Sequence, residues 1–312
     1  MRGHAAGRLG AVLVALLVLA TACTPAGQPE VHVPPVTTAA DEVLVGAFNF
    51  PESRLLAELY TQALAAAGYP MAPVLQLGSR EIVEPALEQG RIDLVPEYTG
   101  SALGFLEQDA AIAGADVDAT HARLVRAFAQ RGVTVADAAP AQNQNAFAVT
   151  RETAAEHDLR TLTDLAGVAG ELVLGGPPEC PQRHTCLAGL QDVYGVQFAR
   201  FLSLRQRAHV VAALEAGEID VGLLFTTDPD VLINDFAVLA DDRDLQPAEN
   251  VVPVIRDAVI ERHGPDLTAV LDRVSAGLTT AELGRLNLAA EQRPDEIEAV
   301  AQEWLERHGL TP

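Results

Sequence analysis

A segment in the first third of the chain recurs 127 residues later, and this internal repeat constrains the fold more than any other feature. Residues 87–94, LEQGRIDL, return as residues 214–221, LEAGEIDV. Several identical or similar residues fall into the same register: Pro51 on Pro178, Arg80 on Arg207, Tyr98 on Phe225, and Thr99 on Thr226. A register shared by separate segments indicates a duplicated structural unit.

Each copy reads as short apolar strands alternating with amphipathic helices. In the first copy we expect strands at 43–47, 74–77 and 92–95, with helices beginning near Pro51 and Ser79. Proline just inside a helix and serine just before one both mark helix starts. Strands that alternate with helices form parallel-type α/β sheets. The sequence therefore predicts two similar α/β lobes.

The repeat also predicts where a ligand would bind. Crevices between α/β lobes form at the carboxyl ends of strands and are the usual ligand sites. Tyr98 and Thr99 follow a predicted strand in the first copy, and Phe225 and Thr226 follow its counterpart in the second. We therefore expect an aromatic ring and a hydroxyl on each wall of a cleft.

The N-terminus predicts export. Residues 1–22 carry two arginines, no acid, an apolar run and a small-residue end, which is the pattern of a secretory signal peptide. Cys23 resembles the lipidated cysteine of a bacterial lipobox, although an ordinary signal followed by an incidental cysteine is the alternative. Residues 23–41 mix Pro, Thr and Ala without apolar periodicity, as a flexible tether does. The expected location is extracytoplasmic, lipid-anchored at the outer face of the cell membrane or periplasmic.

Composition narrows the possible partners. The net charge of −22 argues against nucleic acid, whose phosphates need a basic face. An apolar fraction of 49% excludes a disordered chain. No segment after the N-terminal one is long and apolar enough to cross a membrane.

Two cysteines lie close together in the sequence just after Pro178 and Glu179. In an oxidising compartment, Cys180 and Cys186 are expected to form a disulfide. A metal site that adds His184 is the alternative, but it lacks a fourth ligand and the usual spacing. Between the cysteines, Arg183 could reach a ligand carboxylate or remain a solvated loop residue. No metal or cofactor is predicted.

The sequence supports an enzymatic role less well than a binding role. Glu52, Glu179 and Asp228 could face the cleft, which would suit a hydrolase with paired carboxylates. However, Glu52 and Glu179 fall in expected helix first turns, where carboxylates are favoured by the backbone alone. The chain has neither a His-Glu-x-x-His nor a Gly-x-Ser-x-Gly motif. An exported hydrolase is therefore the second hypothesis. A surface adhesin is disfavoured, because the repeat predicts a cleft rather than a flat face.

Four segments carry a resemblance to a known family: VGAFNFPES at 45–53, LGSRE at 77–81, PEYTG at 96–100 and FTTDP at 225–229. They resemble the glycine betaine/choline-type substrate-binding proteins of osmoprotectant ABC importers. The resemblance implies a bilobal class II periplasmic-binding-protein fold that acts as a monomer with an ABC permease as partner. It places residues 42–144 and 229–312 in lobe 1, and residues 145–228 in lobe 2.

The resemblance also implies an aromatic cage for a quaternary ammonium, which has no hydrogen to donate. Tyr98 and Phe225 match cage positions, whereas Asn145 and Leu187 stand where the family has further rings, and Phe48 replaces a lysine. The ligand is therefore a betaine in a partial cage or a larger polar solute. The candidate ligand-binding residues are Phe48, Asn49, Ser79, Arg80, Tyr98, Thr99, Asn143, Asn145, Glu179, Phe225, Thr226, Thr227 and Asp228.

Overall fold

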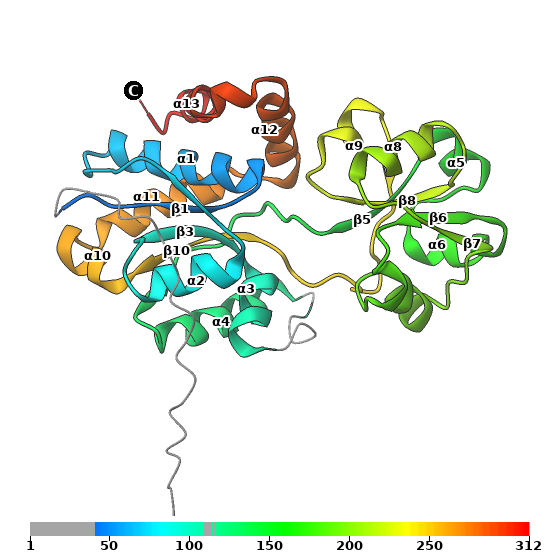
Figure 1. Cartoon of the computed structure of the whole chain (residues 1–312), viewed down its shortest axis with the longest axis horizontal. Coiled ribbons are helices and arrows are strands. Elements are labelled where there is room, and N and C mark those ends of the chain that lie inside the picture. Colours follow the sequence, from blue (N-terminus) through cyan, green and yellow to red (C-terminus); the bar gives the residue numbers. More distant parts are fainter. Residues whose placement is uncertain (1–40, 109–113, 115, 312) are drawn as a thin grey trace, which may run out of the picture. The chain divides into compact units, whose positions relative to one another are not determined.

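A computed structural model describes residues 41–108, 114 and 116–311 of the chain (Figure 1). The predicted signal peptide, Cys23 and nearly all of the tether lie outside these residues. Within the described part of the chain, no helix is both long enough and apolar enough to span a membrane.

The first lobe is built around a sheet in the strand order β2-β1-β3-β10-β4. Strands β1 and β2 pair in parallel, β10 runs antiparallel between β3 and β4, and a single bridge from Val45 to Leu94 joins the two parts. The strands are β1 (Gly46–Phe48), β2 (Leu75–Gly78), β3 (Leu94–Tyr98), β4 (Val133–Val135) and β10 (Val251–Arg256).

The second lobe repeats this order in one five-stranded sheet, β7-β6-β8-β5-β9. Its strands are β5 (Asn145–Val149), β6 (Val173–Gly176), β7 (Arg200–Ser203), β8 (Val221–Phe225) and β9 (Ala237–Val238). Tyr98 at the end of β3 pairs with Val251, and Phe225 at the end of β8 pairs with Asn145. The predicted pair of similar α/β lobes is therefore confirmed, with β1, β2 and β3 corresponding to β6, β7 and β8.

Helices cover both sheets (Figure 1). Those of the first lobe are α1 (Pro51–Ala66), α2 (Arg80–Glu88), α3 (Thr99–Glu107), α4 (Val117–Ala129), α10 (Asp257–His263), α11 (Asp266–Gly277), α12 (Thr280–Gln292) and α13 (Ile297–Arg307). Those of the second are α5 (Arg151–Glu156), α6 (Leu162–Ala166), α7 (Leu187–Gly189), α8 (Arg207–Glu215) and α9 (Pro229–Ile233). Short 3₁₀ turns at 169–171, 180–182 and 294–296 and a π-helical turn at 190–194 complete the set.

The two copies differ most where the first copy has α1. That helix runs unbroken for 16 residues, but its counterpart is divided into the 180–182 turn, α7 and the 190–194 turn. The Cys180–Cys186 disulfide lies in this divided segment. By contrast, α2 and α8 keep the 127-residue offset at both ends.

A glycine in each sheet lets an isoleucine lie against the backbone. A Cβ on Gly46 would come within 2.4 Å of Ile92, and a Cβ on Gly175 within 2.4 Å of Ile219. The two isoleucines are repeat counterparts and are fully buried or nearly so. Such close packing leaves no room for a side chain at either glycine.

The hydrophobic core of the first lobe joins both ends of the described chain. Val43 and Val45 belong to the same buried cluster as Trp304 and Leu305. The second lobe has clusters of its own, drawn from residues between 147 and 239. The core of the first lobe is therefore made from two distant parts of the sequence.

The chain passes between the sheets along two extended segments, one before β5 and one before β10 (Figure 1). The return was expected near residues 225–228, but β9 pairs with β5 in the second sheet, and Tyr194 bonds Asp241. Residues 237–241, which were expected in the first lobe, lie with the second lobe, because the second sheet takes one more strand before the chain returns.

Candidate ligand-binding site

A cavity of about 480 Å³ lies between residues of the two lobes. It is lined from the first lobe by Phe50, Pro51, Glu52, Arg80, Tyr98, Ser101, Asn143, Glu249, Asn287 and Glu291, and from the second by Arg207, Phe225, Asp228 and Pro229. A concave site with aromatic walls and a few polar groups has the properties of a small-molecule pocket.

Aromatic rings face this cavity from both lobes. Phe50 stacks on Tyr98 with ring centroids 6.3 Å apart, and buried Phe48 stacks behind Phe50 at 5.8 Å. From the second lobe, Phe225 leaves 48% of its surface exposed. Ring faces of this kind attract cations through their quadrupoles.

Glu52 is the centre of a hydrogen-bond network on the wall of the first lobe. The Tyr98 hydroxyl donates to its carboxylate at 2.5 Å, the Asn143 amide donates at 2.7 Å, and the Asn287 amide donates to its other oxygen. Burial and the nearby Glu52 carboxylate raise the pKa of Tyr98 well above its ordinary value, so the phenol stays a donor. The network fixes the ring and both amides in place.

Two arginines at repeat-equivalent positions line the cavity, one from each lobe. Arg80 bonds both oxygens of the buried Glu97 carboxylate at 2.7 and 2.8 Å, and its guanidinium lies 5.0 Å from the centre of the Phe48 ring. In the second lobe, Arg207 contacts several carboxylates. These are Asp228 at 3.2 Å, Asp230 at 2.8 Å and, from α12 of the first lobe, Glu291.

Glu249 contributes a further carboxylate. It accepts hydrogen bonds from the backbone N–H of Ser101 at 3.0 Å and from the Ser101 hydroxyl at 2.8 Å. Burial raises the pKa of Glu249 to about 7, and burial also raises the pKa of Asp228. These carboxyls lie in the first and second lobe respectively.

The structure brings several of the predicted residues to the cavity: Arg80, Tyr98, Asn143, Phe225 and Asp228. Asn145 and Glu179 line a neighbouring cavity of about 240 Å³ in the second lobe. Phe225, Arg207 and Asp228 line both cavities, so the two adjoin.

Other predicted residues are placed elsewhere. Phe48 is 3% exposed and lies behind Phe50, while the exposed Asn49 and Ser79 do not line either cavity. Thr99 and Thr227 are buried.

The hydroxyls of Thr99 and Thr226 are used by the backbone. Thr99 donates to the Ala248 carbonyl and accepts from the Asn250 N–H. Likewise, Thr226 donates to the carbonyl of Gln142 and accepts from the N–H of Gln144. Both hydroxyls therefore hold the segments that cross between the lobes.

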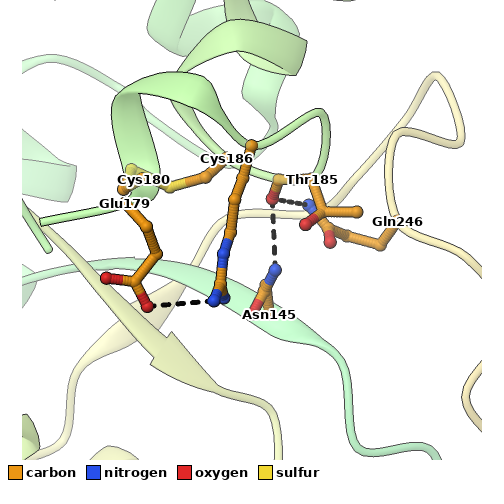
Figure 2. Close-up of a disulfide and its surroundings, with 7 residues drawn as sticks. Asn145, Glu179, Cys180, Thr185, Cys186 and Gln246 are labelled. Carbon is orange, nitrogen blue, oxygen red and sulfur yellow. Dashed lines mark hydrogen bonds and ion pairs between the residues drawn. A yellow bond between two sulfur atoms is a disulfide. The ribbon is translucent and has the colours of Figure 1, made fainter. Parts of the chain in front are cut away.

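The disulfide forms between Cys180 and Cys186 as predicted, and both residues are fully buried (Figure 2). The Thr185 carbonyl beside it accepts from Asn145 at 3.2 Å and from Gln246 at 3.0 Å. The loop is therefore tied to both crossing segments. No metal-binding group is found among the described residues.

Arg183, which lies between the two cysteines, pairs with Glu179 at 2.9 Å. Both side chains are about half exposed, and both line the smaller cavity.

Sequence reasoning missed several lining residues. The repeat could have identified Arg207 from Arg80, and Phe50 lies within the segment VGAFNFPES at 45–53. Glu249, Asn287 and Glu291 were not among the predicted residues, because the chain reaches the cavity again only after it has returned to the first lobe.

Two α/β lobes of matching topology, joined by two crossing segments and enclosing a cavity lined from both sides, define a solute-binding protein of the class II periplasmic type. Comparison with known proteins gives the family. Residues 41–307 match the model for the substrate-binding domain of the ABC-type glycine betaine transport system, and the chain belongs to this family. It is thus the binding component of a transporter and not an enzyme, as predicted.

Relatives agree with this assignment. The chain is 26% identical to the glycine betaine-binding protein YehZ of Escherichia coli (strain K12), covering 88% of this chain and 92% of YehZ. It is 25% identical to the carnitine transport binding protein OpuCC of Listeria monocytogenes, covering 87% and 88%. The crystal structure of a glycine betaine/carnitine/choline ABC transporter superposes with a TM-score of 0.79 at 25% identity, covering 86% of this chain and 99% of that one.

Proposed function

We propose that this protein captures a small quaternary-ammonium solute between Phe50 and Tyr98 of the first lobe and Phe225 of the second. The observation that carries the proposal is the presence of aromatic faces on both walls of one cavity. A quaternary ammonium donates no hydrogen bond, so ring faces and carboxylates recognise it best. Relatives named for glycine betaine and carnitine support the same class.

The lobes then close on the solute and present it to an ABC permease. Closure matters because a permease can distinguish loaded from empty protein only if the two differ in shape. The protein acts as a monomer held at the outer face of the membrane by lipid on Cys23, with residues 23–41 as tether. Cys23→Ser should move the processed protein from the membrane fraction to the soluble fraction.

Calorimetric titration with choline, glycine betaine and carnitine tests the capture of solute. We expect one-to-one binding to at least one of them, weakened about tenfold in Phe225→Ala by loss of the ring face. Ile233→Ala is the matched control, because Ile233 is 56% exposed and does not line the cavity. Absence of binding across the panel, or equal effects of both substitutions, would contradict the proposal.

A polar solute without a quaternary ammonium is the second candidate. Asn143 and Asn287 line the cavity and favour it, since an amide can bind a hydroxyl or amine of the ligand. Binding of such a solute, insensitive to Phe225→Ala, would select this candidate over the first.

A further inference from the structure

Resting on the proposed function, we propose that the cavity selects solutes that are cations overall and disfavours zwitterions that carry a carboxylate. A quaternary ammonium occurs both in simple cations such as choline and in zwitterions such as glycine betaine, and the charge of the cavity lining distinguishes between the two.

Carboxylates outnumber guanidiniums around the cavity. The lining contains four acidic side chains, Glu52, Asp228, Glu249 and Glu291, and two basic ones, Arg80 and Arg207. Charges within a few ångströms of one another in a partly buried site interact strongly, because little water screens them. A cation entering this cavity is attracted on balance, and a ligand carboxylate is repelled.

Neither arginine is available to a ligand carboxylate without giving up a partner. Arg80 is held by two hydrogen bonds to Glu97, whose side chain is fully buried. If Arg80 turned from Glu97 to a ligand, the buried Glu97 carboxylate would be left without its ion-pair partner, which is costly. Arg207 is shared among Asp228, Asp230 and Glu291. Each arginine is therefore already neutralised by this chain.

The carboxylates also lie beside the rings that would hold the ammonium. Glu52 accepts a hydrogen bond from the Tyr98 hydroxyl, and Asp228 accepts one from the backbone N–H of Phe225 at 2.8 Å. One acid is therefore bonded to the aromatic residue on each wall. An ammonium held between the two residues would have an acid on both walls, and the lining adds two further acids, Glu249 and Glu291, that disfavour the attached carboxylate of a betaine.

The test compares two ligands that differ in the negative charge in question and in one added methyl group. Glycine betaine and its methyl ester share the trimethylammonium and the carbon skeleton, but the ester lacks the negative charge. Calorimetric titration of the full chain should show the ester and choline binding about tenfold or more tightly than glycine betaine. Glu249→Gln and Glu291→Gln should each narrow this ratio.

Glu171→Gln is the matched control, because Glu171 is exposed and lies outside the cavity. It should leave the ratio unchanged, and circular dichroism should show that every variant is folded. Glycine betaine binding as tightly as its ester would overturn the charge selection while leaving the proposed function intact. If no quaternary-ammonium ligand binds at all, the proposed function and this inference both fail.

Discussion

Thr99 and Thr226 are repeat counterparts, and each hydroxyl bonds in the same way to a segment that crosses between the lobes. The Thr99 hydroxyl donates at 2.9 Å to the Ala248 carbonyl and accepts at 3.1 Å from the Asn250 N–H. The Thr226 hydroxyl donates at 2.7 Å to the carbonyl of Gln142 and accepts at 3.0 Å from the N–H of Gln144. Each threonine fixes the end of a central strand to one crossing segment.

Thr99→Val should therefore destabilise the protein although it changes no cavity residue. Valine keeps the shape of threonine but leaves a buried carbonyl and a buried N–H without partners, which costs about 1–3 kcal/mol. Urea unfolding measures this loss. Because the proposed closure of the lobes would bend the crossing segments, ligand affinity should change as well.

Thr99→Ser is the control for this substitution, since serine keeps the hydroxyl. It should retain most of the unfolding free energy that Thr99→Val loses. Equal stability and equal affinity in the two variants would show that the hydroxyl contributes nothing at this position.

The equivalent arginines Arg80 and Arg207 should differ in their contribution to stability. Arg80→Ala leaves the buried Glu97 carboxylate unpaired and should cost about 3–5 kcal/mol. Arg207 is 40% exposed, and its partners Asp230 and Glu291 are partly exposed, so Arg207→Ala should cost less than Arg80→Ala although Asp228 is buried. Urea unfolding of both variants checks this, and equal losses would contradict the difference in burial.

The repeat explains why much of the fold was predictable. The succession of strands and helices along the chain follows from local apolar segments that alternate with amphipathic ones. The 127-residue offset relates α2 to α8 and β3 to β8. The return of the chain was placed too early, because β9 has only two residues and gives no periodic signal. Short strands are defined by their partners in the sheet rather than by their own pattern.

The site was predictable only in part, for a similar reason. Tyr98 and Phe225 were found because they end strands in both copies. The hydroxyl of Thr99 looked like a ligand group in sequence, but its bonds depend on residues about 150 positions away. Likewise, Glu291 reaches Arg207 across 84 positions, which no local pattern encodes.

Loss of the disulfide should destabilise the protein. Replacing Cys180 and Cys186 together by serine opens a short loop and should cost about 2 kcal/mol, the amount expected for a loop of this size. The measurement is thermal unfolding of the double variant and of the parent protein. Reductant is the control, since it should lower the melting temperature of the parent and leave that of the variant unchanged.

Affinity for a cationic solute should rise with pH through neutrality. Burial raises the pKa of Glu249 to about 7 from an ordinary value of 4.5, so the carboxyl is mostly neutral at pH 6 and mostly ionised at pH 8. Ionisation adds a negative charge to the cavity, which should strengthen binding of choline several-fold. Titration of choline at pH 6, 7 and 8 measures this change.

The same group should make the free protein less stable at higher pH. The pKa of Glu249 is higher in the folded state than in the unfolded state, so between pH 4.5 and 7 the folded state binds more protons. Its contribution to the unfolding free energy is therefore present at low pH and is lost as pH rises through about 7.

A bound cation favours the ionised Glu249 carboxylate, so binding at pH 7 should release protons. The release is measurable as a dependence of the binding enthalpy on the ionisation enthalpy of the buffer. Glu249→Gln should abolish the proton release and flatten the pH dependence, and an unchanged profile in this variant would assign the effect to another group.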